Sequence, residues 1–102
     1  MTSASTAITI IASAKALPGK EAALERALRD VSGPTRAQAG CLGFKLYRSE
    51  DSAVVTAVEH WASKGDHERH LQGAHVQKLM AAMAGIVAGP PQIASYRALD
   101  EQ

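Results

Sequence analysis

The side chains that could do chemistry are gathered in one short stretch of this 102-residue chain. They are Tyr47, Glu59, Trp61, His70 and His75, and Trp61 is the only tryptophan. Aromatic residues make up only 4% of the chain, so we expect this group to shape a shared cavity. An imidazole titrates near neutral pH, which makes His75 and His70 candidates for a catalytic base or for a hydrogen bond to a substrate. Glu59 could orient one of these histidines or a substrate hydroxyl.

The wall of such a cavity would come from large apolar and aromatic side chains. Trp61 and Tyr47 each combine a ring with one polar group, and Phe44 and Met80 are further candidates for contact with a substrate. A structural role is the alternative for two of them. A tryptophan can equally be a core or interface residue, and Met80 can be core filler.

Two of the polar candidates could also have a purely structural role. His70 could flank a helix break at Gly73, and Glu59 could pair with Arg48 or Arg36. Ion pairs near a surface contribute little to stability. The sequence leaves both interpretations open.

A metal site is a weaker alternative. His67 and His70 are spaced as neighbours on one face of a predicted helix, with His75 and Glu59 as further ligands. A single His-x-x-His pair is weak evidence for zinc, and the predicted break at Gly73 moves His75 off that helix. We therefore expect no metal, and we expect His67 to be exposed.

Composition and charge narrow the class of protein. The net charge is +1 and no basic block occurs, which argues against nucleic acid or an anionic membrane as a partner. Cys41 is the single cysteine, so an intrachain disulfide is excluded and a cysteine-based zinc site has no support. The apolar run 7–14 is too short to span a membrane and lacks the basic flank of a signal peptide. We expect a soluble, cytoplasmic protein with one domain over 1–102, of which 1–6 form a disordered tail.

Hydrophobic patterning predicts four strands, at 7–14, 42–49, 54–61 and 92–99. The middle two are joined by a short turn and form an antiparallel hairpin.

Helical periodicity predicts two helical regions between these strands. Pro18 and Gly19 open the first, and Pro34 should interrupt it, because proline lacks a backbone N–H and clashes with the preceding turn. The second begins at Ser63, whose spacing to Asp66 fits a capping box. Gly73 should divide this region into two helices.

The order β-α-β-β-α-β predicts an α+β, ferredoxin-like, four-stranded antiparallel sheet with helices on one face. The third predicted strand carries apolar residues on both faces: Val54 and Val58 on one, Val55 and Ala57 on the other. A sheet face that is covered by nothing should be polar, so we expect a second copy of the chain to cover it in a twofold homodimer. A monomer with a mildly apolar face is the alternative.

Five segments of the chain carry a family resemblance: Leu17–Glu21, Thr35–Phe44, Leu46–Ser49, Glu59–Ser63 and His70–His75. Together they resemble the antibiotic biosynthesis monooxygenase family, and the resemblance covers nearly the whole chain. It implies the fold of that family, a dimeric α+β barrel. It is less specific for activity, because the family includes cofactor-free oxygenases of anthrones and quinols, haem-degrading enzymes and an isomerase of a signalling molecule.

Within the family the resemblance differs between branches. Trp61 matches the tryptophan that anthrone oxygenases use in their pocket, but those enzymes have an asparagine where this chain has Ala57. The haem-degrading branch has a tryptophan where this chain has His70, and its haem-ligating histidine aligns near Met80, so haem degradation is not expected. The Glu-x-Trp and His-x4-His segments are similar to those of quinol-oxygenase-like members.

The resemblance implies a cofactor-independent monooxygenase that oxidises a small aromatic, such as a quinol, an anthrone or a polyketide-like phenol, with dioxygen. In such chemistry the substrate loses a proton and its anion reduces dioxygen, so the protein supplies a base, polar groups for the anion and a dry pocket. Two alternatives stay open: a non-catalytic small-ligand-binding or stress-related dimeric module, and an isomerase acting on a small carbonyl compound. The expected partners are a second copy, the substrate and dioxygen.

Overall fold

The computed structural model describes residues 6–100. The disordered tail expected over 1–6 therefore falls, except for its last residue, outside the described residues. The elements follow one another as β1 (Ile8–Lys15), α1 (Glu21–Arg36), β2 (Cys41–Arg48), β3 (Val54–Trp61), α2 (Lys64–Leu71), α3 (Ala74–Met83) and β4 (Gln92–Tyr96).

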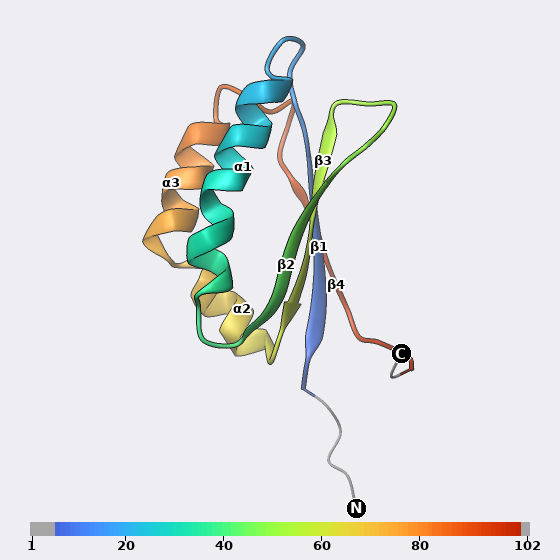
Figure 1. Ribbon diagram of the computed structural model, residues 1–102, viewed down its shortest axis with the longest axis vertical. Coiled ribbons are helices and arrows are strands. Elements are labelled where there is room, and N and C mark those ends of the chain that lie inside the picture. The colour runs from blue at the N-terminus through green and yellow to red at the C-terminus, as the bar shows by residue number, and fades with distance from the viewer. Residues whose placement is uncertain (1–5, 101–102) are drawn as a thin grey trace, which may run out of the picture.

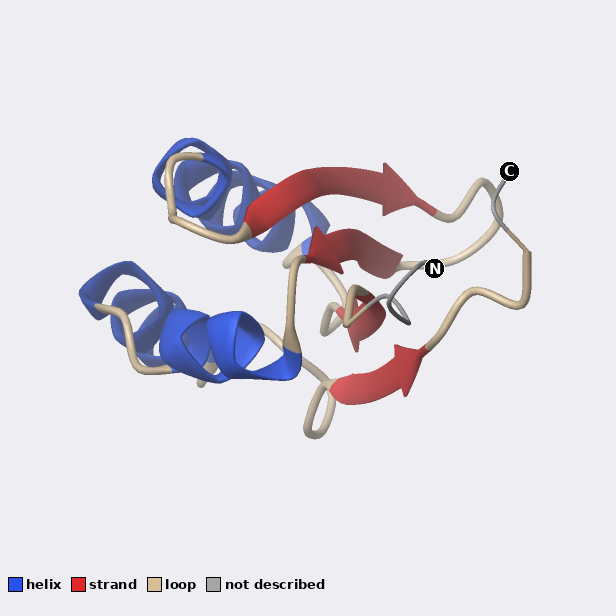
Figure 2. Cartoon of the chain, turned by 90° about the horizontal axis from the view of Figure 1, so that it is seen from below, coloured by secondary structure: helices blue, strands red, loops and turns tan. Residues whose placement is uncertain are grey.

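The four strands form one antiparallel sheet in the order β2-β3-β1-β4, and the three helices cover one of its faces (Figures 1 and 2). This confirms the predicted ferredoxin-like architecture. The strand over 54–61 has the predicted bounds, the first two strands differ from prediction by one residue at each end, and β4 ends at Tyr96 rather than at residue 99.

Helix α1 continues through Pro34 to Arg36, so the predicted interruption at this proline is wrong. A proline disfavours helical backbone in the preceding residue partly through contact with the Cβ of that residue. The preceding residue here is Gly33, which has no Cβ. Pro34 also lies in the last turn, so only Thr35 and Arg36 of the helix follow the hydrogen bond that its missing N–H removes.

The second helical region is divided as predicted. Ser63 is the N-cap of α2, and its hydroxyl accepts the backbone N–H of Asp66. Gly73 is the N-cap of α3. A Cβ at Gly73 would lie 2.8 Å from Cε1 of His75, so a larger residue at this position would have to displace the imidazole.

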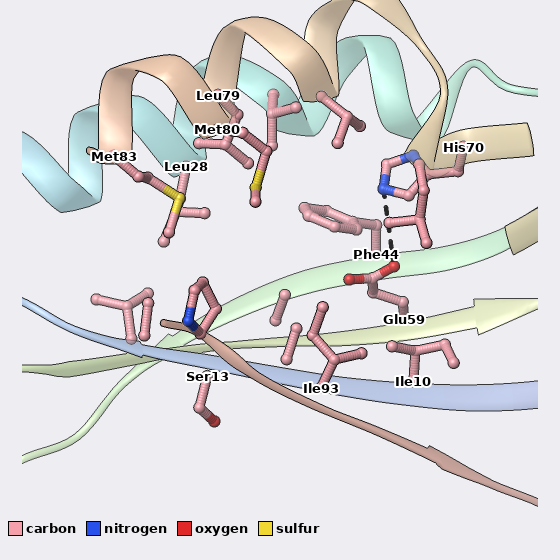
Figure 3. A pocket seen from close by; sticks show the side chains of 18 of the residues that line it. Ile10, Ser13, Leu28, Phe44, Glu59, His70, Leu79, Met80, Met83 and Ile93 are labelled. Atoms are coloured by element: carbon pink, nitrogen blue, oxygen red, sulfur yellow. Dashed lines mark ion pairs between the residues drawn. The ribbon is translucent and has the colours of Figure 1, made fainter. Parts of the chain in front are cut away.

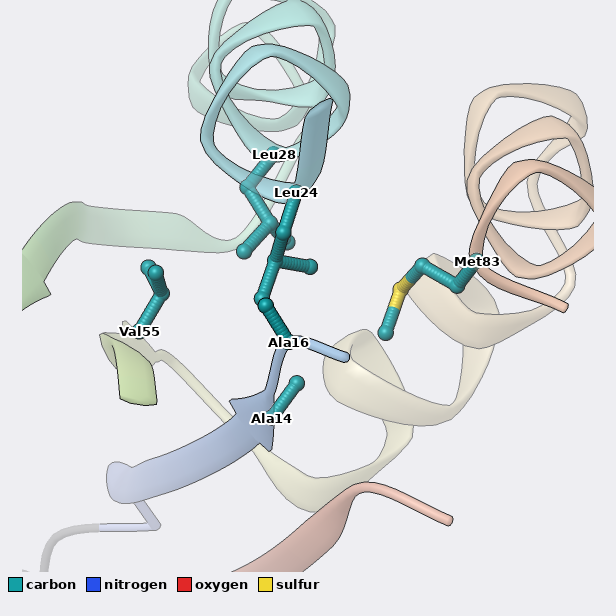
Figure 4. Close-up of a cluster of buried hydrophobic side chains, with 6 residues drawn as sticks. All are labelled: Ala14, Ala16, Leu24, Leu28, Val55 and Met83. Carbon is teal, nitrogen blue, oxygen red and sulfur yellow. The ribbon is translucent and has the colours of Figure 1, made fainter. Parts of the chain in front are cut away.

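The core lies between the sheet and the helices. Its largest cluster joins α1 and α3 to strands β1 and β3 (Figure 4); its members are Ala14, Ala16, Leu24, Leu28, Val55 and Met83. A second cluster, at the other end of the sheet, packs the fully buried Trp61 against Ile8 and Ile10. No helix within 6–100 is long and apolar enough to cross a membrane.

The sheet face away from the helices is partly apolar. Ile11 pairs with Val58 on one side and with Ala94 on the other, and all three are half-buried. Tyr47 and Tyr96 are 49% and 52% exposed. The homodimer that the sequence leads us to expect would cover this face, and it stays a prediction.

Candidate active site

A cavity of about 330 Å³ lies between the helix-facing side of the sheet and helices α1 and α3 (Figure 3). Its wall is almost entirely apolar. Helices α1 and α3 contribute six of the lining side chains: Leu28, Val31, Val76, Leu79, Met80 and Met83. The sheet contributes Ile10, Phe44 and Ala57 among others. Small apolar ligands commonly bind in pockets of this size and character.

The mouth of the cavity lies where α3 faces β4. Met80 and Ile93 line the cavity and are 51% and 55% exposed, so they form an apolar rim that is open to solvent. Pro90 and Pro91, which precede β4, complete this rim. A ligand can therefore enter past apolar side chains and keep its own apolar surface in contact with the protein.

Glu59 places a carboxyl group at the inner end of this apolar cavity. Strand pairing sets it between Phe44 on β2 and Ile10 on β1, with all three on the helix-facing side. The side chain is buried, and Trp61 Nε1–H donates a hydrogen bond to its Oε1 atom over 2.9 Å. Burial raises the pKa of Glu59, because a carboxylate loses solvation there, while the Trp61 bond acts in the opposite direction.

Neither of the arginine partners considered for Glu59 contacts it. Arg48 pairs with Glu25 on α1 over 3.1 Å, and the Arg36 Nε–H donates to the carbonyl oxygen of Phe44. The interpretation of Glu59 as half of a structural ion pair with Arg48 or Arg36 is therefore wrong.

His70 faces Glu59 from α2. Its Nε2 atom lies 4.0 Å from Glu59 Oε1, along the dashed line in Figure 3, and its ring stacks near Trp61 with centroids 4.8 Å apart. Burial, followed by the nearby His75 and His67, lowers the pKa of His70 to about 4. The imidazole is therefore neutral at pH 7, and the cavity ends in a neutral histidine beside a buried carboxyl group.

His75 lies next to this pair but does not line the cavity. Its Nε2 atom is 3.1 Å from Oε1 of Gln38, and the same oxygen lies 2.6 Å from Nδ1 of His70. Trp61 is also behind the wall, fully buried against Glu59. Of the expected catalytic residues, Glu59 and His70 line the cavity. His75 lies outside it, in contact with Gln38 and His70.

Two of the expected substrate-binding residues, Phe44 and Met80, line the cavity. Tyr47 lies on the opposite face of the sheet, where it pairs across from Thr56. Side chains alternate along a strand, so Phe44 and Tyr47, three positions apart, point to opposite faces. A role for Tyr47 in this cavity has no support from its placement.

The expectation that His67 is exposed is wrong. It is buried, lines the cavity, and lies with its ring centroid 6.1 Å from that of Trp61. Its spacing of three from His70 was the available signal, because such residues share one helix face. No sequence pattern indicated that Gln38, in the turn between α1 and β2, belongs to the site. Among residues 6–100, no three His, Cys, Asp or Glu side chains are grouped so that they could hold a metal ion.

Acid is expected to destabilise the fold through His70. The pKa of His70 is about 4 in the folded protein against an ordinary value of 6.5, so the unfolded chain takes up the proton first as the pH falls. The free energy of unfolding should therefore decrease between pH 6.5 and 4, by on the order of 2 kcal/mol. Urea unfolding at about pH 7 and about pH 4.5 measures this loss.

The variant His70→Gln isolates this effect. Glu59, whose pKa is raised, contributes with the opposite sign, because the folded state binds its proton more readily than the unfolded chain. His67, whose pKa is lowered, acts in the same direction as His70 and persists in the variant. The variant should lose less stability on acidification than the wild type; an equal loss would rule out His70 as the source.

The fold and site define a ferredoxin-like α+β protein with a largely apolar cavity that ends in a buried carboxyl group and a neutral histidine. The family model described as antibiotic biosynthesis monooxygenase matches residues 7–82. The chain therefore belongs to the antibiotic biosynthesis monooxygenase family.

Individual relatives agree with this assignment. The chain is 27% identical over 94 residues to the Mycobacterium tuberculosis protein named "Putative monooxygenase Rv0793", with 92% of this chain and 93% of that protein covered. The structure of Rv0793 superposes with a TM-score of 0.88 at 26% identity, covering 93% of this chain and 97% of the other. PA3566 of Pseudomonas aeruginosa superposes with a TM-score of 0.89 at 30% identity, covering 97% and 100%.

Proposed function

We propose that this protein is a cofactor-independent monooxygenase that oxidises a small aromatic enol or phenol, such as a quinol or an anthrone, with dioxygen. One observation carries the proposal: the carboxyl group of Glu59 is buried at the inner end of an apolar cavity, with His70 Nε2 only 4.0 Å from its Oε1 atom. Membership of a monooxygenase family supports the same reaction class.

Glu59 is the proton acceptor in this proposal. A general base works best when its pKa is near the operating pH, and burial moves the pKa of Glu59 upward from 4.5 in that direction. One hydroxyl oxygen can lie about 2.8 Å from both Glu59 Oε1 and His70 Nε2, because these atoms are 4.0 Å apart. A substrate hydroxyl in that position can pass its proton to Glu59 or to His70.

The transferred proton then helps to stabilise the substrate anion. Once protonated, either Glu59 or His70 becomes a hydrogen-bond donor and can direct its N–H or O–H at the substrate oxygen. The apolar wall excludes water from the anion. The charge is thus stabilised only after proton transfer, which favours the reactive form of the substrate over its resting form.

The substrate anion supplies the electrons. In a substrate with a methylene carbon conjugated to the enolate, a carbon–oxygen bond forms between that carbon and dioxygen. The peroxide-bearing carbon then loses its remaining hydrogen as a proton while the O–O bond breaks, so that a carbonyl group forms in the product and one water molecule leaves. Two carbon–hydrogen bonds of the substrate provide the four electrons, and one oxygen atom enters the product.

A second copy of the chain belongs to this proposal as well. The partly apolar outer face of the sheet, with Ile11, Val58 and Ala94 half-buried, supports a homodimer in which two sheets pack face to face. The cavity lies on the other face, so each subunit would keep its own site.

Oxygen uptake with anthrone and a panel of substituted quinols tests the function. We expect uptake without added cofactor and in the presence of a chelator, with one atom from labelled dioxygen in the product and one in water. Uptake that yields a quinone and hydrogen peroxide would contradict a monooxygenase. Ligand binding without uptake would favour the binding module, and isomer formation under nitrogen would favour the isomerase.

A further inference from the structure

We infer that Gln38 is a positioning residue that fixes the tautomer of His70, so that the unprotonated Nε2 atom of His70 faces Glu59 and the substrate. The tautomer follows from the position of the Gln38 amide oxygen between the two imidazole rings. Its catalytic consequence rests on the proposed function, in which His70 Nε2 accepts a proton.

Gln38 presents one oxygen atom to two imidazole rings. Its Oε1 atom lies 2.6 Å from His70 Nδ1 and 3.1 Å from His75 Nε2. An amide oxygen has two lone pairs and no proton, so it can accept both hydrogen bonds but donate neither. Both of these ring nitrogens must therefore carry a hydrogen, and in the neutral rings the other nitrogen of each must be free. For His70 the free nitrogen is Nε2, which lies 4.0 Å from Glu59 Oε1.

The turn that carries Gln38 is held at both ends. The backbone N–H of Gln38 donates to the carbonyl of Thr35, and its own carbonyl accepts the N–H of Cys41. Gly40, two residues on, has a φ of 85° and its carbonyl accepts the N–H of Ala62 over 2.8 Å. A Cβ at Gly40 would collide with the carboxyl group of Asp66. The backbone around Gln38 is thus tied to α1, to β2 and to the segment after β3.

The chemical type of residue 38 matters as much as its position. His70 is faced by Glu59 from β3, by His67 from its own helix and by His75 from α3. A carboxylate at position 38 would also hold Nδ1–H, but its charge would favour the imidazolium form of both neighbouring histidines. The neutral amide sets the tautomer while it leaves His70 uncharged.

Loss of this acceptor would change the Nε2 atom of His70 from a hydrogen-bond acceptor to a donor. Without a partner for Nδ1–H, His70 can place its hydrogen on Nε2 and direct it at Glu59 Oε1. An N–H group that points at a carboxylate favours its ionised form, so Glu59 would become a weaker base. His70 would also no longer be able to accept a proton at Nε2.

The tautomer can be read directly from long-range ¹H–¹⁵N spectra of the imidazole rings at neutral pH. The test compares the wild type with Gln38→Leu, which removes the acceptor at similar size, and with Gln38→Glu, which keeps an acceptor. Gln72→Leu is the matched control, because Gln72 is exposed and lies two residues from His70. We expect Nδ1–H at His70 in the wild type, the control and Gln38→Glu, and Nε2–H in Gln38→Leu.

Activity provides the second readout. We expect Gln38→Leu to lower kcat/KM about tenfold or more, as for other residues that orient a functional histidine, and Gln72→Leu to leave it unchanged. In Gln38→Glu, His70 should become protonated at a higher pH than in the wild type. An Nε2–H form of His70 in the wild type or in Gln38→Glu, or an unchanged tautomer in Gln38→Leu, would overturn the inference. If the tautomers behave as expected but no variant consumes oxygen with any substrate, the proposed function fails and the positioning role stands.

Discussion

Replacing Glu59 with glutamine is expected to lower kcat/KM for oxygen uptake about 10²- to 10⁴-fold, the usual contribution of a general base. The amide oxygen of glutamine can still accept the hydrogen bond that Trp61 donates, so the fold should be kept. The substitution removes only the ability to take up the substrate proton. Steady-state oxygen uptake with the best quinol or anthrone measures the effect.

The pH profile gives the same experiment a second readout. Burial raises the pKa of Glu59 above 4.5, so the wild-type kcat/KM should decline on acidification with a midpoint above that value, and Glu59→Gln should lose this limb. Glu50→Gln is the matched control, since Glu50 is an exposed carboxylate in the loop between β2 and β3. If Glu59→Gln kept most of the wild-type rate, Glu59 could not be the base.

Truncating Trp61 to alanine is expected to destabilise the fold by about 3–5 kcal/mol, as for other large aromatic residues in a core. Trp61 is fully buried, packs against Ile8 and Ile10, and donates the hydrogen bond that Glu59 accepts. The variant loses the packing and also leaves a buried carboxyl group without its donor, which adds to the cost. Urea unfolding followed by circular dichroism measures the change without relying on the lost fluorophore.

Two further variants separate packing from hydrogen bonding. Trp61→Phe keeps most of the ring and should cost less, about 1–3 kcal/mol, mainly through the lost N–H donor. Because the Trp61 bond lowers the pKa of Glu59 in the wild type, its loss should move the acid limb of kcat/KM to higher pH. Leu99→Ala, at a fully exposed leucine, should change stability by no more than about 0.5 kcal/mol. A Trp61→Ala protein as stable as this control would contradict the core role of Trp61.

Most of the fold could be predicted because its signals are local. β-branched and alternating residues predicted the strands, including the bounds of Val54–Trp61, and Ser63 and Gly73 predicted where α2 and α3 begin. The same strand period put Glu59 and Trp61 on one face, two residues apart. The misreading of Pro34 shows the limit of a single-residue rule, since the neighbouring Gly33 removes part of the steric conflict.

The site could be predicted only in part, because its contacts join residues that are far apart in the chain. The titratable side chains of Glu59 and His70 marked these two residues as candidates. Nothing in the local sequence indicates that Gln38, 32 positions before His70, supplies the oxygen that both His70 and His75 contact. The burial of His67 likewise depends on how α2 packs over Trp61. The sequence by itself thus determined the elements and their order, through side-chain periodicity and turn chemistry. The tertiary structure decided which polar groups share the cavity, because only packing brings the turn after α1, strand β3 and helix α2 to one place.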